Sequence, residues 1–220
     1  MSDKKNIDWK DLLLNKAFDL VMVILGITIA FQLDNWKQAA ERGSQEKFYT
    51  QNLLGDLNAD IKDMTENLVE LKSDAAIVRS YLDRMDDLPA DSLIKPVMAI
   101  MTFETFAGNR NTYETLVAST GLNTFSEPEV VEKLTEYYST YTSIRRLESV
   151  YTAAIFEINQ HFSQYMIYDK GLITDKRVVT LPATRNSLIV AHEQLNGGIE
   201  DYEYALSRAL ELQEALARER

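Results

Sequence analysis

The chain has 220 residues, with 34 acidic against 23 basic side chains and no cysteine. Its formal charge of −11 lies entirely in residues 48–220, because residues 1–47 carry seven side chains of each sign. So acidic a domain is a poor binder of nucleic-acid phosphate, and a chain without cysteine forms neither disulfides nor thiolate metal sites.

The first 36 residues predict a membrane anchor. Residues 1–16 are an amphipathic lead-in, and residues 17–36 form the predicted transmembrane helix. Eleven large apolar side chains between Ala17 and Leu33 contribute about 3–6 kcal/mol of insertion free energy. Asp19 opposes insertion, but near a helix end it costs less than the roughly 2.5–3.5 kcal/mol quoted for the centre. Trp9 and Trp36 flank the span as expected interfacial anchors.

A cleaved signal peptide is the alternative to an anchor, but Gln38-Ala39-Ala40 lacks the small residue that cleavage needs at the −3 position. Four lysines precede the span and three basic residues closely follow it. By a narrow margin, the positive-inside rule then favours a cytoplasmic N-terminus and a periplasmic domain. Within the span, Asp19 and the small pair Gly26 and Ala30 are candidate intramembrane contacts.

Residues 37–47 form the expected membrane-exit joint, with Gly43-Ser44 as its hinge, and residues 48–220 form the acidic helical domain. A heptad-like apolar stripe from Leu57 to Met85 predicts the first bundle helix, over residues 44–86. The second leg is broken. A helix over residues 93–106, capped by Asp91 or Ser92, stops near Gly108-Asn109, and a short helix over residues 113–120 ends at Gly121, a left-handed stop.

A capping box at residues 126–129, with Pro128 in the first turn, opens a third helix to about Ile167. Residues 168–185 lack helical period and include a candidate extended piece at residues 178–181. A last helix runs from Asn186, with Gly197-Gly198 expected to loosen or kink it. The pattern predicts an all-α protein: one N-terminal transmembrane helix, followed by an extramembrane up-down four-helix bundle with a broken second helix.

Four segments carry a resemblance to a known family. They are the span exit Gly26-Ile27-Thr28-Ile29-Ala30-Phe31-Gln32-Leu33-Asp34-Asn35-Trp36, the helix start at residues 53–60, the segment with Thr112, Tyr113, Glu114, Leu116, Gly121 and Leu122, and the pair Tyr137-Tyr138. Through them the chain resembles an uncharacterised, Bacteroidota-type family of single-span inner-membrane proteins, catalogued as a domain of unknown function. The resemblance implies an inner-membrane anchor with a helical domain and brings no activity. It also implies a carboxylate at the depth of Asp19, where the family usually has glutamate.

Chemical motifs are sparse. The chain has two histidines, His161 and His192, which could face each other across the turn at residues 168–185. A bis-histidine haem is the alternative to a hydrogen-bonded core His192 and a surface His161. No Glu-x-x-His pair, phosphate loop, nucleophile elbow or His-Glu-x-x-His motif occurs. We interpret the carboxylates as a solvated face and the tyrosines as packing, and expect no enzyme activity, cofactor or metal.

Two function classes remain open. The first is an accessory or scaffolding subunit that contacts the lipid bilayer and other membrane protein subunits, and not nucleic acid. The second is a ligand-binding, sensor-like helical module, which is disfavoured because about sixteen residues before the span leave little room for an output domain. The expected partner contacts are two exposed apolar residues near the membrane and a basic far loop: Leu122, Phe125, Lys170, Lys176, Arg177 and Arg185.

Overall fold

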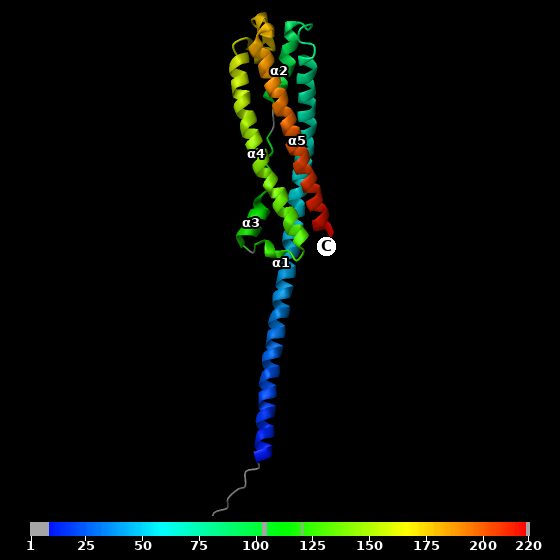
Figure 1. Cartoon of the computed structure of the whole chain (residues 1–220), viewed down its shortest axis with the longest axis vertical. Coiled ribbons are helices and arrows are strands. Elements are labelled where there is room, and N and C mark those ends of the chain that lie inside the picture. The colour runs from blue at the N-terminus through cyan, green and yellow to red at the C-terminus, as the bar shows by residue number, and fades with distance from the viewer. Residues whose placement is uncertain (1–8, 103–104, 120, 219–220) are drawn as a thin grey trace, which may run out of the picture. The chain divides into compact units, whose positions relative to one another are not determined.

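The computed structural model describes residues 9–102, 105–119 and 121–218, with their side chains from Lys16 onward except that of residue 17. The chain divides into two compact units, Met1–Phe48 and Tyr49–Arg220. Five α-helices dominate the described residues, and the only strands among them form one two-residue pair (Figure 1). The all-α prediction is confirmed.

The first unit contains the start of helix α1 (Trp9–Leu82). Among the described residues, one segment is long and apolar enough to cross a membrane, and none of its most apolar 18-residue window is buried. Thr28, the single polar side chain between Leu20 and Phe31, donates a hydrogen bond to the Ile24 carbonyl at 2.8 Å. Its hydroxyl is therefore satisfied within the helix, as an apolar medium requires.

Helix α1 is helical without a break through Gly43 and Ser44, so the predicted hinge has no counterpart in the secondary structure. From Tyr49 onward the helix belongs to the second unit. There its heptad stripe faces the core, with Leu53, Leu57, Met64 and Val78 fully buried. The apolar residues recur every three or four positions, which places them on one side of a 3.6-residue helix.

The second leg of the bundle is broken, as the sequence predicts. It comprises a short 3₁₀ turn η1 (Ala90–Leu93), helix α2 (Ile94–Met101), a non-helical stretch that includes residues 105–110, and helix α3 (Asn111–Ser119). A second 3₁₀ turn, η2 (Leu122–Thr124), then leads to helix α4. Gly121 has a φ of +73° but a ψ of 173°, so its backbone is not in the left-handed helical region and the predicted left-handed stop is wrong, although φ is positive.

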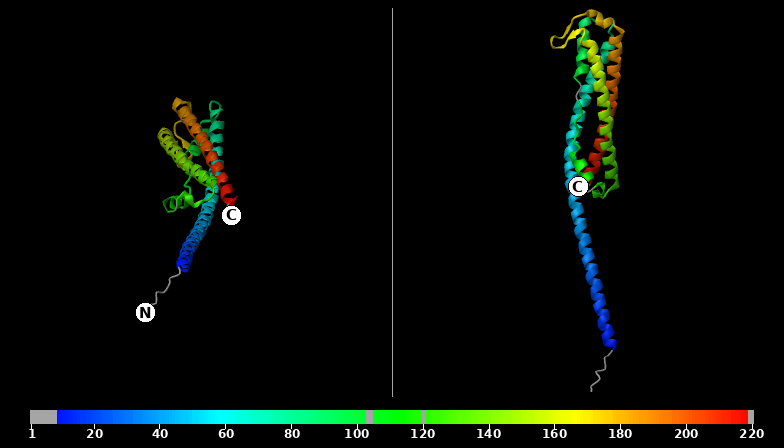
Figure 2. Two further views of the ribbon diagram at one scale, coloured as in Figure 1. Left: turned by 60° about the horizontal axis from the view of Figure 1, so that its bottom comes forward. Right: turned by 90° about the vertical axis from the view of Figure 1, so that its left-hand side faces the viewer.

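Helices α4 (Pro128–Phe162) and α5 (Pro182–Arg218) run antiparallel and pack along their length (Figures 1 and 2). Helix α4 is shorter than predicted, and Glu127, not Ser126, is its N-cap. Helix α5 continues without interruption through Gly197 and Gly198. A Cβ at Gly198 would lie 3.7 Å from the side chains of Leu147 and Leu71, an ordinary van der Waals distance, so this position has room for a methyl group.

The connection between α4 and α5 forms a structured tip. Strands β1 (Met166–Ile167) and β2 (Leu172–Ile173) pair antiparallel around the 3₁₀ turn η3 (Tyr168–Lys170), and the 3₁₀ turn η4 (Lys176–Thr180) follows. The prediction of an extended segment at residues 178–181 is therefore wrong, because most of it belongs to the η4 turn. Asp175 accepts the backbone N–H of Arg177 and starts a turn that buries Val178 in the core.

Phe125 and Leu122 correct a second prediction. Phe125 is only 5% exposed and belongs to the core, and Leu122 is half-buried and packs against it. The η2 turn causes this, because Phe125 N–H donates to the Leu122 carbonyl at 3.2 Å and folds both side chains back against the bundle. These residues are not the exposed apolar contact that we expected.

Candidate functional site

The predicted intramembrane contacts share one face of α1. Asp19, Gly26 and Ala30 are all exposed, and a Cβ at Gly26 would meet nothing within 4 Å. Their spacings of seven and four residues place them within about 40° of one another around a helix that turns about 100° per residue. This aligned set is called the Asp19 face below. Trp36 is 74% exposed, whereas the side chain of Trp9 lies outside the described residues.

The four cations expected at the basic far loop are in different situations. Arg177 forms an ion pair with Asp175, whose pKa is held at about 2 by hydrogen bonds from the Arg177 side chain and backbone. Arg185 lies in α5 rather than in the loop, and pairs with Asp86 at 2.9 Å. Lys170 and Lys176 are exposed and have no acidic partner among the described residues. The positive charge of the tip is thus smaller than the sequence suggests.

The two histidines have separate partners. His161 Nε2 lies 2.9 Å from Thr184 Oγ1, and Thr184 in turn donates to the Val178 carbonyl. Since that hydroxyl has one proton, it accepts from His161, which therefore carries its proton on Nε2. His192 Nδ1 lies 3.2 Å from the side-chain amide of Asn196. Among the described residues, no group of three or more His, Asp or Glu side chains is placed to hold a metal ion.

A buried carboxylate at the centre of the bundle was missed by the sequence interpretation. Asp60, on α1, is 1% exposed and accepts hydrogen bonds from the phenols of Tyr137, at 2.7 Å, and Tyr141. Its other oxygen accepts the backbone N–H and the side-chain amide of Asn109, at 2.9 and 2.7 Å. Burial, together with the Asp60 carboxylate, raises the pKa of both tyrosines well above the usual value, so they stay protonated donors.

A second buried acid, on α4, binds a phenol and a backbone N–H in the same way. Glu148 is 8% exposed and accepts the backbone N–H of Phe106 at 2.6 Å and the phenol of Tyr202 at 2.9 Å. Between the two contacts, Gly108 has a φ of +61°, and a Cβ there would lie 2.2 Å from the ring of Tyr141. Asp60 and Glu148 therefore satisfy backbone groups that the interrupted second leg cannot pair within a helix.

This pair of acids, which we call the carboxylate clamp, is a structural device. Three parts of the chain meet around it, since Asp60 on α1 bonds Tyr137 on α4, and the ring of Tyr138 stacks on that of Tyr113 on α3 at a centroid distance of 4.0 Å. All four hydrogen bonds to Asp60 come from the protein itself. The clamp holds the second leg to α1, α4 and α5.

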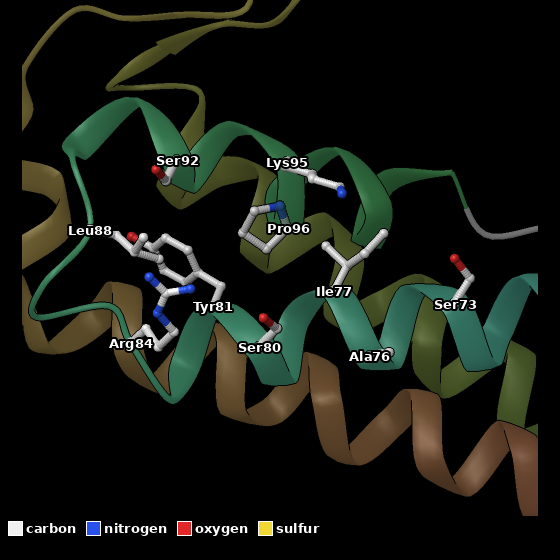
Figure 3. A pocket seen from close by; sticks show the side chains of 10 residues that line it. All are labelled: Ser73, Ala76, Ile77, Ser80, Tyr81, Arg84, Leu88, Ser92, Lys95 and Pro96. Atoms are coloured by element: carbon white, nitrogen blue, oxygen red, sulfur yellow. The ribbon is translucent and has the colours of Figure 1, made fainter.

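The exposed candidate site is a groove of about 490 Å³ between the end of α1 and the η1–α2 segment (Figure 3). Figure 3 shows Arg84, Tyr81 and Leu88 together at one end of the groove, and Lys95 on its opposite wall. Its polar lining is Ser73, Ser80, Tyr81, Arg84, Ser92 and Lys95. Its apolar lining is Ala76, Ile77, Leu88 and Pro96. We call it the Arg84–Lys95 groove.

Comparisons with protein-family models, with characterised proteins and with solved structures find no match to this chain.

Proposed function

We propose that this chain is a non-enzymatic, membrane-anchored helical protein of the bacterial inner membrane. In this proposal it acts by contact, as an accessory or scaffolding subunit of a larger membrane protein complex. One contrast carries the proposal. The large apolar side chains from Phe18 to Leu33 are 50–66% exposed, whereas the second unit buries its own apolar stripes. Such a continuous apolar surface is stable in lipid and unfavourable in water.

The Asp19 face supports a lateral partner within the membrane. Small residues at Gly26 and Ala30 let a second helix approach closely. A carboxylate such as Asp19 in a membrane segment favours a polar partner or a water-filled space. Both features lie on the same side of α1, so one neighbouring helix could satisfy both.

The carboxylate clamp supports a scaffolding role for the bundle. The acids most deeply placed in the core bind phenols and backbone amides, an arrangement that fixes the geometry of the second leg. A bundle whose legs are held together in this way presents a constant outer surface, which suits a subunit that works by contact. The lysines before the span favour a cytoplasmic N-terminus and a periplasmic bundle.

Site-specific photocrosslinking in native membranes tests the proposal. A photoreactive amino acid replaces Gly26, on the Asp19 face, or Ile24, which lies about 160° away around the helix at nearly the same depth. We expect a discrete protein adduct from position 26 and lipid adducts from position 24. Lipid adducts alone from both positions would refute a lateral subunit contact.

The second function class, a ligand-binding module, is favoured by one observation, the Arg84–Lys95 groove. Its volume of about 490 Å³ falls in the range of small-molecule sites, roughly 300–1,000 Å³. The groove does not depend on a subunit role, because a scaffold can also bind a small molecule.

A further inference from the structure

The Arg84–Lys95 groove has a charge opposite to that of its domain. The chain carries 11 more acidic than basic residues, yet the groove lining contains Arg84, Lys95 and no carboxylate. Neither cation has an acidic partner among the described residues. Of the acids nearest Arg84 in the chain, Asp83 pairs with Arg79 at 3.0 Å and Asp86 with Arg185 at 2.9 Å, although the charge of Asp86 also reaches Tyr81 in the groove.

The hydrogen-bonding groups of the groove are donors suited to an anion. A guanidinium binds a carboxylate or phosphate through two parallel N–H bonds, and an ammonium adds a compact positive charge. Tyr81 is only 4% exposed, and its side chain lines the groove beside Arg84 and Leu88. Burial and the nearby charge of Asp86 raise the pKa of Tyr81, so its phenol remains a donor. Ser80 and Ser92 add hydroxyls from the two walls.

The remaining lining is apolar and argues for an organic ligand. Ile77 lies on the α1 wall, Pro96 on the α2 wall and Leu88 in the turn between them (Figure 3). Inorganic phosphate would leave this surface uncovered, whereas an aromatic or short aliphatic body would bury it. The two cations come from opposite walls, so a ligand between them would also tie α2 to the end of α1.

We propose that the Arg84–Lys95 groove binds a small organic anion, a carboxylate or phosphate group on a short apolar body. The anionic group binds the guanidinium of Arg84, beside Tyr81 and Leu88, and the ammonium of Lys95 adds positive charge from the opposite wall (Figure 3). The apolar body rests on Ile77, Leu88 and Pro96. This site goes beyond the proposed scaffolding function and does not rest on it.

Thermal unfolding of the full chain in a nonionic detergent, followed by circular dichroism at 222 nm, tests the site. The probes are phenylacetate and phenyl phosphate, with neutral phenylacetamide and sodium chloride of equal ionic strength as controls. At ten times its dissociation constant, a bound probe raises Tm by about 3–6 °C for a domain of this size. We expect this rise with at least one anion and with neither control. A rise with one anion alone identifies the preferred anionic group.

Variants connect the rise in Tm to the groove. Arg84→Gln and Lys95→Gln should each at least halve it, while Lys170→Gln, which removes an unpaired lysine from the tip, should leave it unchanged. Arg84, Lys95 and Lys170 are exposed, so these substitutions leave the core intact. No rise with either anion, an equal rise with phenylacetamide or salt, or an undiminished rise in both groove variants would each overturn the proposal.

Discussion

Replacing Asp60 tests the carboxylate clamp, because two buried phenols and two part-buried N–H groups of the exposed Asn109 depend on that one side chain. Asp60→Ala leaves two phenols and two groups of Asn109 without their acceptor. A buried unpaired donor costs about 1–3 kcal/mol. The sum overstates the loss, because Tyr137 and Tyr141 can bond each other, their oxygens being 3.3 Å apart, and because the desolvation cost of the carboxylate is recovered. We therefore expect a loss of about 3–5 kcal/mol.

Asp60→Asn keeps the shape and one acceptor oxygen but brings an amide donor to the other pair of donors. We expect a smaller loss, about 1–2 kcal/mol, comparable to exchanging charge-assisted hydrogen bonds for neutral ones. Glu66→Ala is the matched control on the same helix. It removes an exposed acid whose pairing with Lys62, at 3.9 Å, is worth about 0.5 kcal/mol or less.

The assay is urea unfolding of the full chain in a nonionic detergent, followed by far-ultraviolet circular dichroism. With a slope of about 1–3 kcal/mol per molar urea, Asp60→Ala should lower the midpoint by roughly 1–5 M relative to wild type. Asp60→Asn should fall between Asp60→Ala and the control. If Asp60→Ala and Glu66→Ala unfold at the same urea concentration, Asp60 does not hold the second leg and the clamp is wrong.

Three further predictions follow from single positions. Gly108→Ala should destabilise the protein by about 2–5 kcal/mol, because φ is positive there and the new methyl group overlaps the Tyr141 ring. Gly198→Ala should instead stabilise it by about 0.5–1 kcal/mol. Equal urea midpoints for the two variants would contradict this prediction. Burial lowers the pKa of His161 in the folded protein below its usual 6.5. The neutral histidine therefore contributes to the free energy of unfolding above pH 6.5, and this contribution is lost as the pH falls through the lower pKa of the folded state. Stability should therefore decrease between pH 8 and 5.5 more in wild type than in His161→Gln, and parallel pH profiles would refute it. In intact spheroplasts, an impermeant thiol reagent should label Ser139→Cys and not Ser2→Cys, and labelling of Ser2→Cys alone would reverse the orientation.

The all-α architecture could be predicted because it depends on periodicity. The stripe around Leu57 and Met64 is continuous over many turns, and its members are buried in the structure. Gly108 and Gly121 both have positive φ and lie in non-helical parts of the second leg, although α2 already ends at Met101, before the predicted end at residue 106. Local signals of this kind act within a few residues and need no knowledge of the tertiary contacts.

The carboxylate clamp left a sequence signal that the interpretation did not use. Asp60 precedes Ile61, a member of the α1 stripe, by one residue, and Glu148 follows the stripe residue Leu147 on α4. A polar residue beside a core position is ambiguous by itself, because a rotation of about 100° decides between core and solvent. The donors that settle it, Tyr137, Tyr202 and the backbone of residues 106–109, come from distant parts of the chain.

The structure of the tip, the burial of Phe125 and the presence of the groove could not be predicted, because they depend on tertiary contacts that sequence periodicity does not encode. Phe125 lies outside any helix, and the sequence does not show whether the η2 turn directs it inward or outward. The sequence indicates a basic loop that includes Arg177 and Arg185, and the structure pairs these two cations with Asp175 and Asp86. The Arg84–Lys95 groove combines residues on both sides of a turn, and only the folded chain brings its two cations to one cavity.

Purification from native membranes tests the proposed subunit role most directly. The full chain is extracted in a mild detergent and compared with a Gly26→Leu, Ala30→Leu double variant, which fills the small-residue face but keeps the span apolar. We predict that the wild-type chain migrates with a stoichiometric membrane partner, in a particle larger than its own detergent-bound monomer. The double variant should lose that partner and still insert. A wild-type chain that migrates alone, or a partner retained equally by both chains, would contradict the account.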